Sequence, residues 1–260
     1  MRDRLFLNYR RIVEQPWFPI FVKDDFDTET LMEGCRMAGL RVIEYTQRRE
    51  DAAKILPRLR EAFPEATILV GSTLDSDRVV EGMREKYPHL RTLGELSPFV
   101  DGFVSMLPFS DETLEKYTPT HICIPAAETG GEALRQMDRG AAIIKVLGPD
   151  FSFSKRLHAA PTFGYCPTYL TGGVTPERMA EVFAAGNIVC ASGFDVVLKG
   201  IAPEELTAEL VAERIRLFAE TAKRERAKVF PSLADTESLS DEELRAALPN
   251  YCSIPKKESL

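Results

Sequence analysis

The chain has 260 residues, of which 44% are hydrophobic and 28% are charged, and its formal net charge is −7. This length fits one large domain with a substantial core, and the acidic balance argues against nucleic acid as a partner, because such proteins usually carry a basic face. No apolar run approaches the roughly 20 residues that span a bilayer, and the N-terminus lacks the apolar core of a secretion signal. We therefore expect a cytoplasmic protein that binds neither nucleic acid nor membrane.

The five cysteines and three histidines are scattered along the chain. None of them falls into a C-x-x-C, H-x-x-x-H or H-x-E pattern, so a disulfide framework or a protein-bound catalytic metal has little support. The sequence therefore predicts a reduced protein that works without a metal or another cofactor.

Short apolar runs alternate with amphipathic helical stretches from residue 18 to residue 200. Most of the runs are apolar throughout, which is typical of parallel strands buried on both faces. Right-handed βαβ units of this kind close into a barrel when eight of them follow one another. A doubly wound open sheet is the competing fold, but no G-x-G-x-x-G follows the first run. We therefore predict an α/β protein with a (β/α)8 barrel, whose strands lie near Phe18–Val22, Arg41–Thr46, Thr67–Thr73, Gly102–Leu107, His121–Ala126, Ala142–Leu147, Gly164–Thr168 and Ile188–Ser192.

Helical periodicity marks several of the connecting segments. The stretches Thr28–Ala38 and Asp51–Ala62 each place apolar residues on one face. Thr175 followed by Pro176 has the form of an N-cap before a helix-opening proline. The stretch Pro203–Lys228 is expected to be the eighth barrel helix.

Two helical extensions are predicted at the ends of the barrel. Residues 1–16 are expected to form a short helix across its bottom. We place the barrel domain at residues 1–230 and a polar tail at residues 231–260. Within the tail, Ser240 and Glu243 have the spacing of a capping box for a short helix.

Two charged residues stand inside otherwise apolar strands. Lys145 lies within Ala141–Leu147, where burial lowers the pKa of an ammonium and leaves the free amine that Schiff-base chemistry needs. Glu44 follows Val42-Ile43, and a carboxylate there can move protons for such an amine. A buried ion pair between Lys145 and Glu44, with no chemistry, is the competing interpretation.

Small and hydroxyl-bearing residues end three other strands. Gly71 and Thr73 end the third strand, where a backbone can approach a ligand and a hydroxyl can bind a carboxylate. Gly172 and Gly173 precede a predicted helix after the seventh strand, and Ser192-Gly193 ends the eighth. Loops in these positions commonly bind phosphate in barrels of this kind. The pattern predicts a phosphate or carboxylate site.

These residues together resemble the 2-keto-3-deoxy-6-phosphogluconate / 4-hydroxy-2-oxoglutarate aldolases over roughly residues 16–200. The resemblance is strongest at residues 39–48, which are close to that family's second-strand pattern of Glu, Thr and Arg. It continues in residues 70–73, Ile124-Pro125 with Thr129, Lys145, residues 171–174 and Ser192-Gly193.

The resemblance implies a class I enzyme that needs no metal and is usually trimeric. Lys145 then forms the imine with pyruvate or the keto-acid substrate, and Glu44 is the general acid/base. Arg48 and Thr73 hold the pyruvate carboxylate, while the glycine loops hold a distal phosphate or carboxylate. The substrate-binding residues implied are Arg48, Thr73, Gly71, Pro125, Thr171, Gly172, Gly173, Ser192 and Gly193.

The predicted function is therefore cleavage of a 2-keto-3-deoxy sugar acid to pyruvate and an aldehyde. The substrate expected from the resemblance is 6-phosphorylated, or is 4-hydroxy-2-oxoglutarate, so the second product is an aldehyde or phospho-aldehyde. A barrel isomerase or epimerase of phosphosugars is one alternative. A non-catalytic sugar-acid-binding relative is the other, because Val146-Leu147-Gly148 replaces the aromatic residues that follow the lysine in the family.

Overall fold

The computed structural model describes residues 2–22, 25–148, 151–159 and 166–248. It contains one sheet of eight parallel strands in the order β5-β4-β3-β2-β1-β8-β7-β6. The predicted (β/α)8 barrel is thereby confirmed. The strands are β1 (Trp17–Phe21), β2 (Val42–Thr46), β3 (Thr67–Thr73), β4 (Gly102–Ser105), β5 (Ile122–Ile124), β6 (Ile144–Leu147), β7 (Thr168–Thr171) and β8 (Val189–Gly193).

The barrel closes between β5 and β6 through a narrow seam. Lys145 pairs with Ala126 in an isolated parallel bridge. Its N–H donates to the Pro125 carbonyl at 2.8 Å, and its own carbonyl accepts from the Ala127 N–H at 3.2 Å. The Ala142 N–H adds a bond to the Cys123 carbonyl at 3.2 Å. Lys145, which stands out in the sequence by its charged side chain, therefore also closes the sheet through its backbone.

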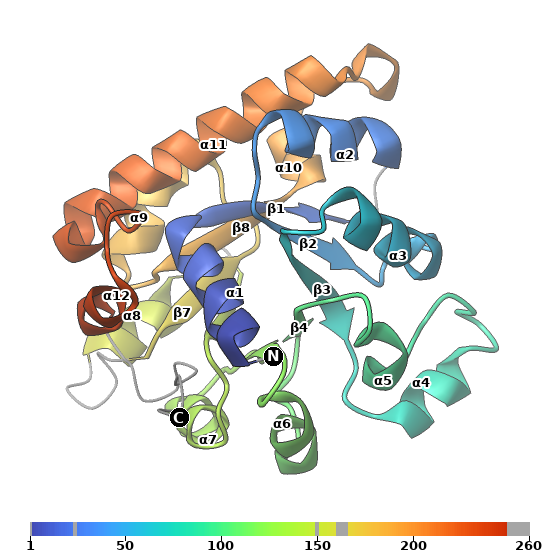
Figure 1. Cartoon of the computed structure of the whole chain (residues 1–260), viewed down its shortest axis with the longest axis horizontal. Coiled ribbons are helices and arrows are strands. Elements are labelled where there is room, and N and C mark those ends of the chain that lie inside the picture. Colours follow the sequence, from blue (N-terminus) through green and yellow to red (C-terminus); the bar gives the residue numbers. More distant parts are fainter. Residues whose placement is uncertain (1, 23–24, 149–150, 160–165, 249–260) are drawn as a thin grey trace.

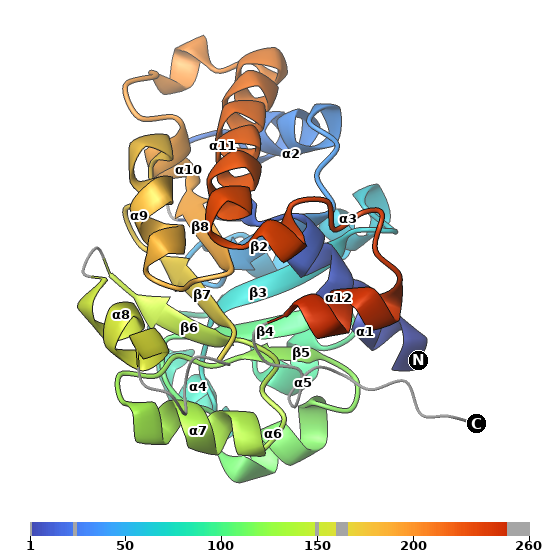
Figure 2. The ribbon, with the colours of Figure 1, turned by 90° about the vertical axis from the view of Figure 1, so that its left-hand side faces the viewer.

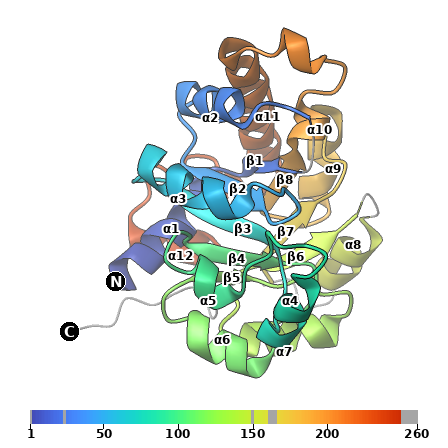
Figure 3. The same ribbon diagram turned by 90° about the vertical axis from the view of Figure 1, so that its right-hand side faces the viewer.

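Helices surround the sheet on its outer side (Figures 1 and 3). The long helix α11 lies beside α2, and this is the largest helix–helix contact within the described parts of the chain (Figure 2). The predicted helices over Thr28–Ala38, Asp51–Ala62 and Pro203–Lys228 correspond to α2, α3 and α11. The helices are α1 (Arg2–Glu14), α2 (Thr28–Met37), α3 (Ala52–Ala62), α4 (Asp77–Met83), α5 (Leu93–Leu96), α6 (Asp111–Tyr117), α7 (Gly130–Asp138), α8 (Ser152–Ala159), α9 (Met179–Ala184), α10 (Phe194–Val197), α11 (Ala208–Val229) and α12 (Asp241–Ala247), with 3₁₀ turns at Pro176–Arg178, Pro203–Glu205 and Pro231–Leu233.

Alternate side chains of the strands enter two separate cores. Outward residues such as Ile43, Val70 and Leu170 pack against the helices. Inward residues such as Leu69 and Tyr169 fill the barrel and pack against α1 and α12. Glu44 pairs with Leu69 and Lys145 pairs with Tyr169, so both side chains lie on the inner side of the barrel. Gly71 and Thr171 lie on the same side, because each follows one of these inward-facing residues by two positions.

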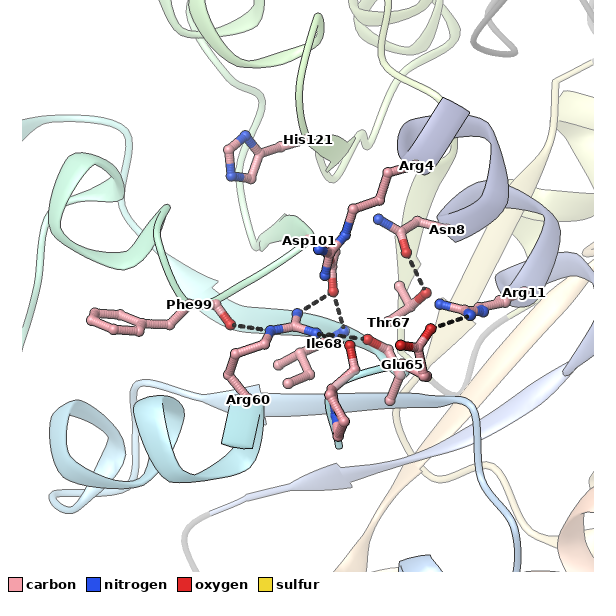
Figure 4. Close-up of polar contacts among 12 residues, drawn as sticks. Arg4, Asn8, Arg11, Arg60, Glu65, Thr67, Ile68, Phe99, Asp101 and His121 are labelled. Carbon is pink, nitrogen blue, oxygen red and sulfur yellow. Dashed lines mark hydrogen bonds and ion pairs between the residues drawn. The ribbon is translucent and has the colours of Figure 1, made fainter. Parts of the chain in front are cut away.

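The helix α1 closes the end of the barrel at which the strands begin. Its residues Leu5, Phe6 and Tyr9 are buried in the inner core. Asn8 accepts a hydrogen bond from the Thr67 hydroxyl at 2.8 Å. Asp101, which precedes β4, binds the guanidinium groups of Arg4 and Arg60 and accepts from the Ile68 N–H (Figure 4). Because this end is sealed, a ligand enters from the carboxyl ends of the strands, where barrel active sites lie.

The tail contributes α12 to the same sealed end. The capping box predicted at Ser240 and Glu243 is present. Leu244 is fully buried in the inner core cluster, and Asp241 pairs with Arg10 of α1 at 2.8 Å. Figure 2 shows α12 beside α1. The division of the chain at residue 230 stays a prediction.

The predicted seventh strand was wrong in position. The sequence placed it at residues 164–168, whereas β7 begins at Thr168; residues 164 and 165 of that prediction lie outside the described residues. Tyr169 and Leu170 belong to the strand, and Tyr169 fills the inner core while Leu170 fills the outer one. The loop glycines therefore follow the strand directly.

None of the helices in the described parts of the chain is long and apolar enough to cross a membrane.

Candidate active site

Lys145 projects from β6 into the barrel and is only 3% exposed. Burial lowers the pKa of its ammonium from the ordinary 10.5, the charge of Glu44 opposes this shift, and the charge of Arg48 adds to it. No hydrogen-bond acceptor among the described residues contacts its Nζ atom, which instead lies 5.7 Å from the centre of the Tyr169 ring. An amine in this setting is a nucleophile at a lower pH than an exposed lysine.

Glu44 projects from β2 and is 1% exposed. Its carboxylate lies directly above Gly71 of β3, where a Cβ atom would stand 2.1 Å from Oε1. A side chain at position 71 would displace the carboxylate, so the glycine makes room for Glu44. The role of Gly71 in substrate binding stays a prediction.

Tyr169 joins these two groups and was missed by the sequence analysis. Its hydroxyl donates to Oε2 of Glu44 at 2.7 Å, and its ring lies beside Lys145. Lys145 and Tyr169 are register partners on neighbouring strands, so their side chains share one face. Burial and the charge of Glu44 raise the pKa of Tyr169 well above its ordinary value, so the phenol stays protonated as a donor. Thr171 lies two residues further along β7, on the same inner face as this phenol.

Replacing Tyr169 with Phe should leave Oε2 of Glu44 without its donor. We expect the free energy of unfolding to fall by about 1–3 kcal/mol, the usual cost of an unsatisfied buried polar group, together with slower turnover. Urea unfolding would measure the loss. Tyr9→Phe is the matched control, because the buried Tyr9 hydroxyl has no partner among the described residues. Equal stability of the two variants would show that the bond to Glu44 contributes nothing.

Two arginines follow β2, and the structure separates their roles. Arg48 is exposed at the mouth, and its charge reaches Lys145. Arg49 is buried and donates to the Thr28 hydroxyl at 2.7 Å and to the Val22 carbonyl at 3.1 Å. Arg49 thus ties the loops after β1 and β2 together, which leaves Arg48 as the arginine available to a ligand.

The end of β3 is irregular. The pairing with β4 shifts register between Val70 and Thr73, and Ser72 adopts a left-handed conformation with φ 57°. This is a conformation that glycine favours. The Thr73 hydroxyl donates to the Val104 carbonyl at 3.0 Å, so it can only accept a hydrogen bond from a ligand.

The remaining predicted ligands lie at strand ends with different orientations. Pro125 is buried and accepts the backbone bond from Lys145. Gly172 and Gly173 are exposed after β7 with positive φ. Ser192 faces the outer core, where its hydroxyl accepts from Trp17 Nε1 at 2.9 Å and donates to the Val174 carbonyl at 2.7 Å. Any contact of Ser192 with a ligand would therefore come from its backbone.

The structure thus brings Lys145, Glu44, Gly71 and Thr171 together around Tyr169, with Arg48 and Thr73 at the mouth. Gly193 lies at the carboxyl end of β8, next to β1. This arrangement offers a buried amine, a buried carboxylate with a phenol donor, and a cation at the entrance. That set of groups suits attack on a carbonyl of an anionic substrate followed by proton transfers.

Comparisons with known proteins agree with this interpretation. No family model matches the chain. A 2-dehydro-3-deoxy-phosphogluconate aldolase of Pseudoalteromonas atlantica is 25% identical over 188 residues, which are 68% of this chain and 78% of that protein. The predicted resemblance to these aldolases is thereby confirmed, and the comparison supports the predicted class of aldehyde-lyase.

Solved structures share the fold at lower identity. A KDPG aldolase from Legionella pneumophila, with pyruvate captured as a covalent carbinolamine, has a TM-score of 0.60 and 17% identity, with 84% of this chain and 98% of that chain covered. A thiamine phosphate pyrophosphorylase from Pyrococcus furiosus has a TM-score of 0.53 and 16% identity, with 80% and 98% covered. Since proteins of different activity share this barrel, the fold alone does not define the reaction.

Proposed function

We propose that this chain, which resembles the 2-keto-3-deoxy-6-phosphogluconate / 4-hydroxy-2-oxoglutarate aldolases in sequence and fold, is a class I aldolase that releases pyruvate from a 2-keto-3-deoxy acid. The observation that carries the proposal is the buried amine of Lys145, whose pKa is lowered by burial, beside the hydrogen-bonded pair of Glu44 and Tyr169. A homotrimer, expected from the resemblance, is part of the proposal.

The reaction begins with attack of the Lys145 Nζ lone pair on the C2 carbonyl of the keto acid. As the carbinolamine forms, the carbonyl oxygen takes up a proton and the nitrogen releases one. Loss of that oxygen as water takes a further proton and leaves the imine protonated on nitrogen. Glu44 is the group that accepts and returns these protons, because its charge acts on Lys145 inside the barrel and its Oε2 is fixed by Tyr169.

Cleavage then uses the imine as an electron sink. Removal of the proton from the C4 hydroxyl by Glu44 breaks the C3–C4 bond and releases an aldehyde. The bonding electrons move into an enamine on Lys145. Protonation of the enamine at C3 and addition of water at C2 return pyruvate and the free amine. Glu44 again supplies and removes the protons, so one carboxylate serves each step.

Arg48 holds the substrate carboxylate at the mouth. Its guanidinium is exposed there, and its charge lowers the pKa of Lys145. An arginine binds a carboxylate through two charge-assisted hydrogen bonds. Thr73 lies beside Arg48 at the end of β3, and its hydroxyl already donates to a carbonyl. Since a carboxylate needs a donor, the donor expected from β3 is a backbone N–H at the register shift.

Reductive trapping with pyruvate and cyanoborohydride tests the proposal. We expect one adduct, on Lys145, identified by mass spectrometry of the digested protein. Because the pKa of Lys145 lies below 10.5, trapping should rise to a plateau at a pH below that value. Below the folded-state pKa the amine is protonated, and trapping should decline with falling pH.

The surface lysine Lys199, which is exposed after α10, serves as the internal comparison. Because Lys199 lies in solvent, outside the barrel, it should be labelled more slowly than Lys145. If Lys145 were labelled no faster than Lys199 at any pH, the amine would not be activated, and an isomerase or a binding protein would become the better explanation.

A further inference from the structure

The loop after β8 carries a carboxylate where an anion site was predicted. A Cβ atom at Gly193 would stand 2.1 Å from Oδ1 of Asp195 and 2.9 Å from a methyl group of Val22. Val22 packs against the inner core of the barrel, and Ala191, two residues before Gly193, lies in that core. The Asp195 carboxylate therefore lies over the inner edge of the mouth, between the ends of β8 and β1.

Two side chains near the predicted anion site already have partners, whereas Gly172 and Gly173 of the β7 loop remain exposed. The Ser192 hydroxyl faces the outer core and has both a donor and an acceptor there. Arg178, the cation nearest the β7 loop among the described contacts, donates to the Gly173 carbonyl at 3.2 Å, and its guanidinium lies 4.8 Å from the centre of the Phe151 ring. The charged group that the described residues place at the β8 end of the mouth is the Asp195 carboxylate, which is negative.

A substrate phosphate beside the Asp195 carboxylate would be repelled by its charge, whereas a carboxylate accepts hydrogen bonds from neutral hydroxyl groups. We infer that the mouth at β8 selects a 2-keto-3-deoxy acid whose distal end is an uncharged polyol, with Asp195 accepting from its hydroxyls, over substrates that end in phosphate or carboxylate. This inference rests on the proposed aldolase function and names its substrate class. Asp195 is a specificity residue; it lies apart from the groups that shift the pKa of Lys145.

Aldol synthesis with paired acceptors tests the selectivity. Pyruvate is offered to the full-length protein with racemic glyceraldehyde or racemic glyceraldehyde 3-phosphate, so that stereochemistry does not decide the result. We expect kcat/KM for the neutral aldehyde to exceed that for the phosphorylated one by about tenfold or more, the scale on which binding contacts discriminate substrates. Asp195→Asn should reduce this ratio by about tenfold, through a gain for the phosphorylated aldehyde.

The control is Asp138→Asn, which removes the same charge from an exposed site at the end of α7. It should leave the ratio unchanged. A preference of the unmodified protein for the phosphorylated aldehyde would overturn the inference. An equal ratio in the Asp195 and Asp138 variants would overturn it as well, because the effect would then come from net charge alone.

Binding of unreactive acids separates this inference from the proposed function. Gluconate and 6-phosphogluconate have no carbonyl that can form an imine, so titration calorimetry with each probes the mouth alone. Asp195→Asn should tighten binding of 6-phosphogluconate relative to gluconate, and Asp138→Asn should not. If pyruvate gives no adduct on Lys145 but this shift appears, the aldolase proposal fails while the charge selection stands. If the adduct forms and the shift is missing, the reverse holds.

Discussion

Replacing Lys145 with Met should abolish pyruvate release, a loss of about 10⁴-fold or more in kcat, as expected when a covalent nucleophile is removed. Methionine has a similar volume and no charge, so it fills the same position in the inner core without strain. Pyruvate release coupled to lactate dehydrogenase would give the rate, and the pyruvate adduct should disappear from the mass spectrum.

Far-UV circular dichroism of the Lys145→Met variant should match that of the unmodified protein. Lys199→Met is the companion variant, because it removes an exposed lysine from the segment after α10. It should retain both turnover and the adduct. Turnover that survives in Lys145→Met would exclude the imine mechanism and leave the lysine as a structural partner of Glu44.

Replacing Glu44 with Gln should slow turnover by about 10²–10⁴-fold, the usual contribution of a general acid/base. Glutamine keeps the shape of the side chain above Gly71, and its carbonyl oxygen can still accept from Tyr169. The variant therefore isolates proton transfer from packing. Single-turnover measurements should show slow formation of the pyruvate adduct, with the adduct still on Lys145.

Glu14→Gln is the control for this loss of charge. Glu14 pairs with Arg10 and Arg41 at the sealed end of the barrel, far from the mouth. Its replacement should leave turnover unchanged. A loss smaller than about tenfold in Glu44→Gln would remove Glu44 from the role of general acid/base.

The barrel and its two charged inner residues could be predicted because their signals are local. Continuous apolar runs indicate parallel strands, and a lone Lys145 or Glu44 within such a run is conspicuous. The capping box at Ser240 and Glu243 and the helix periods are equally local signals. These patterns depend on neighbours along the chain, so they can be recognised without knowledge of the tertiary structure.

Tyr169 and Asp195 could not be recognised in the same way. A tyrosine next to a leucine is ordinary in a strand or a loop, and only the register of β6 against β7 places its ring beside Lys145. The hydroxyl then reaches Glu44 across 125 positions of sequence. The position of Asp195 similarly depends on the backbone of Gly193 and on Val22, which follows β1 and is far from Asp195 in sequence. The orientation of Ser192 also depends on Trp17, which the sequence does not relate to it.

The seam between β5 and β6 makes Lys145 part of the joint that turns an open sheet into a closed one. Its peptide group bonds to Pro125 and Ala127 on the other side of the joint. The Lys145 amine therefore takes its place beside Tyr169 only when the two ends of the sheet have met. Formation of the proposed pyruvate adduct during refolding should therefore report when the β5–β6 joint closes. Opening of this joint in the native protein should stop adduct formation before the rest of the fold is lost.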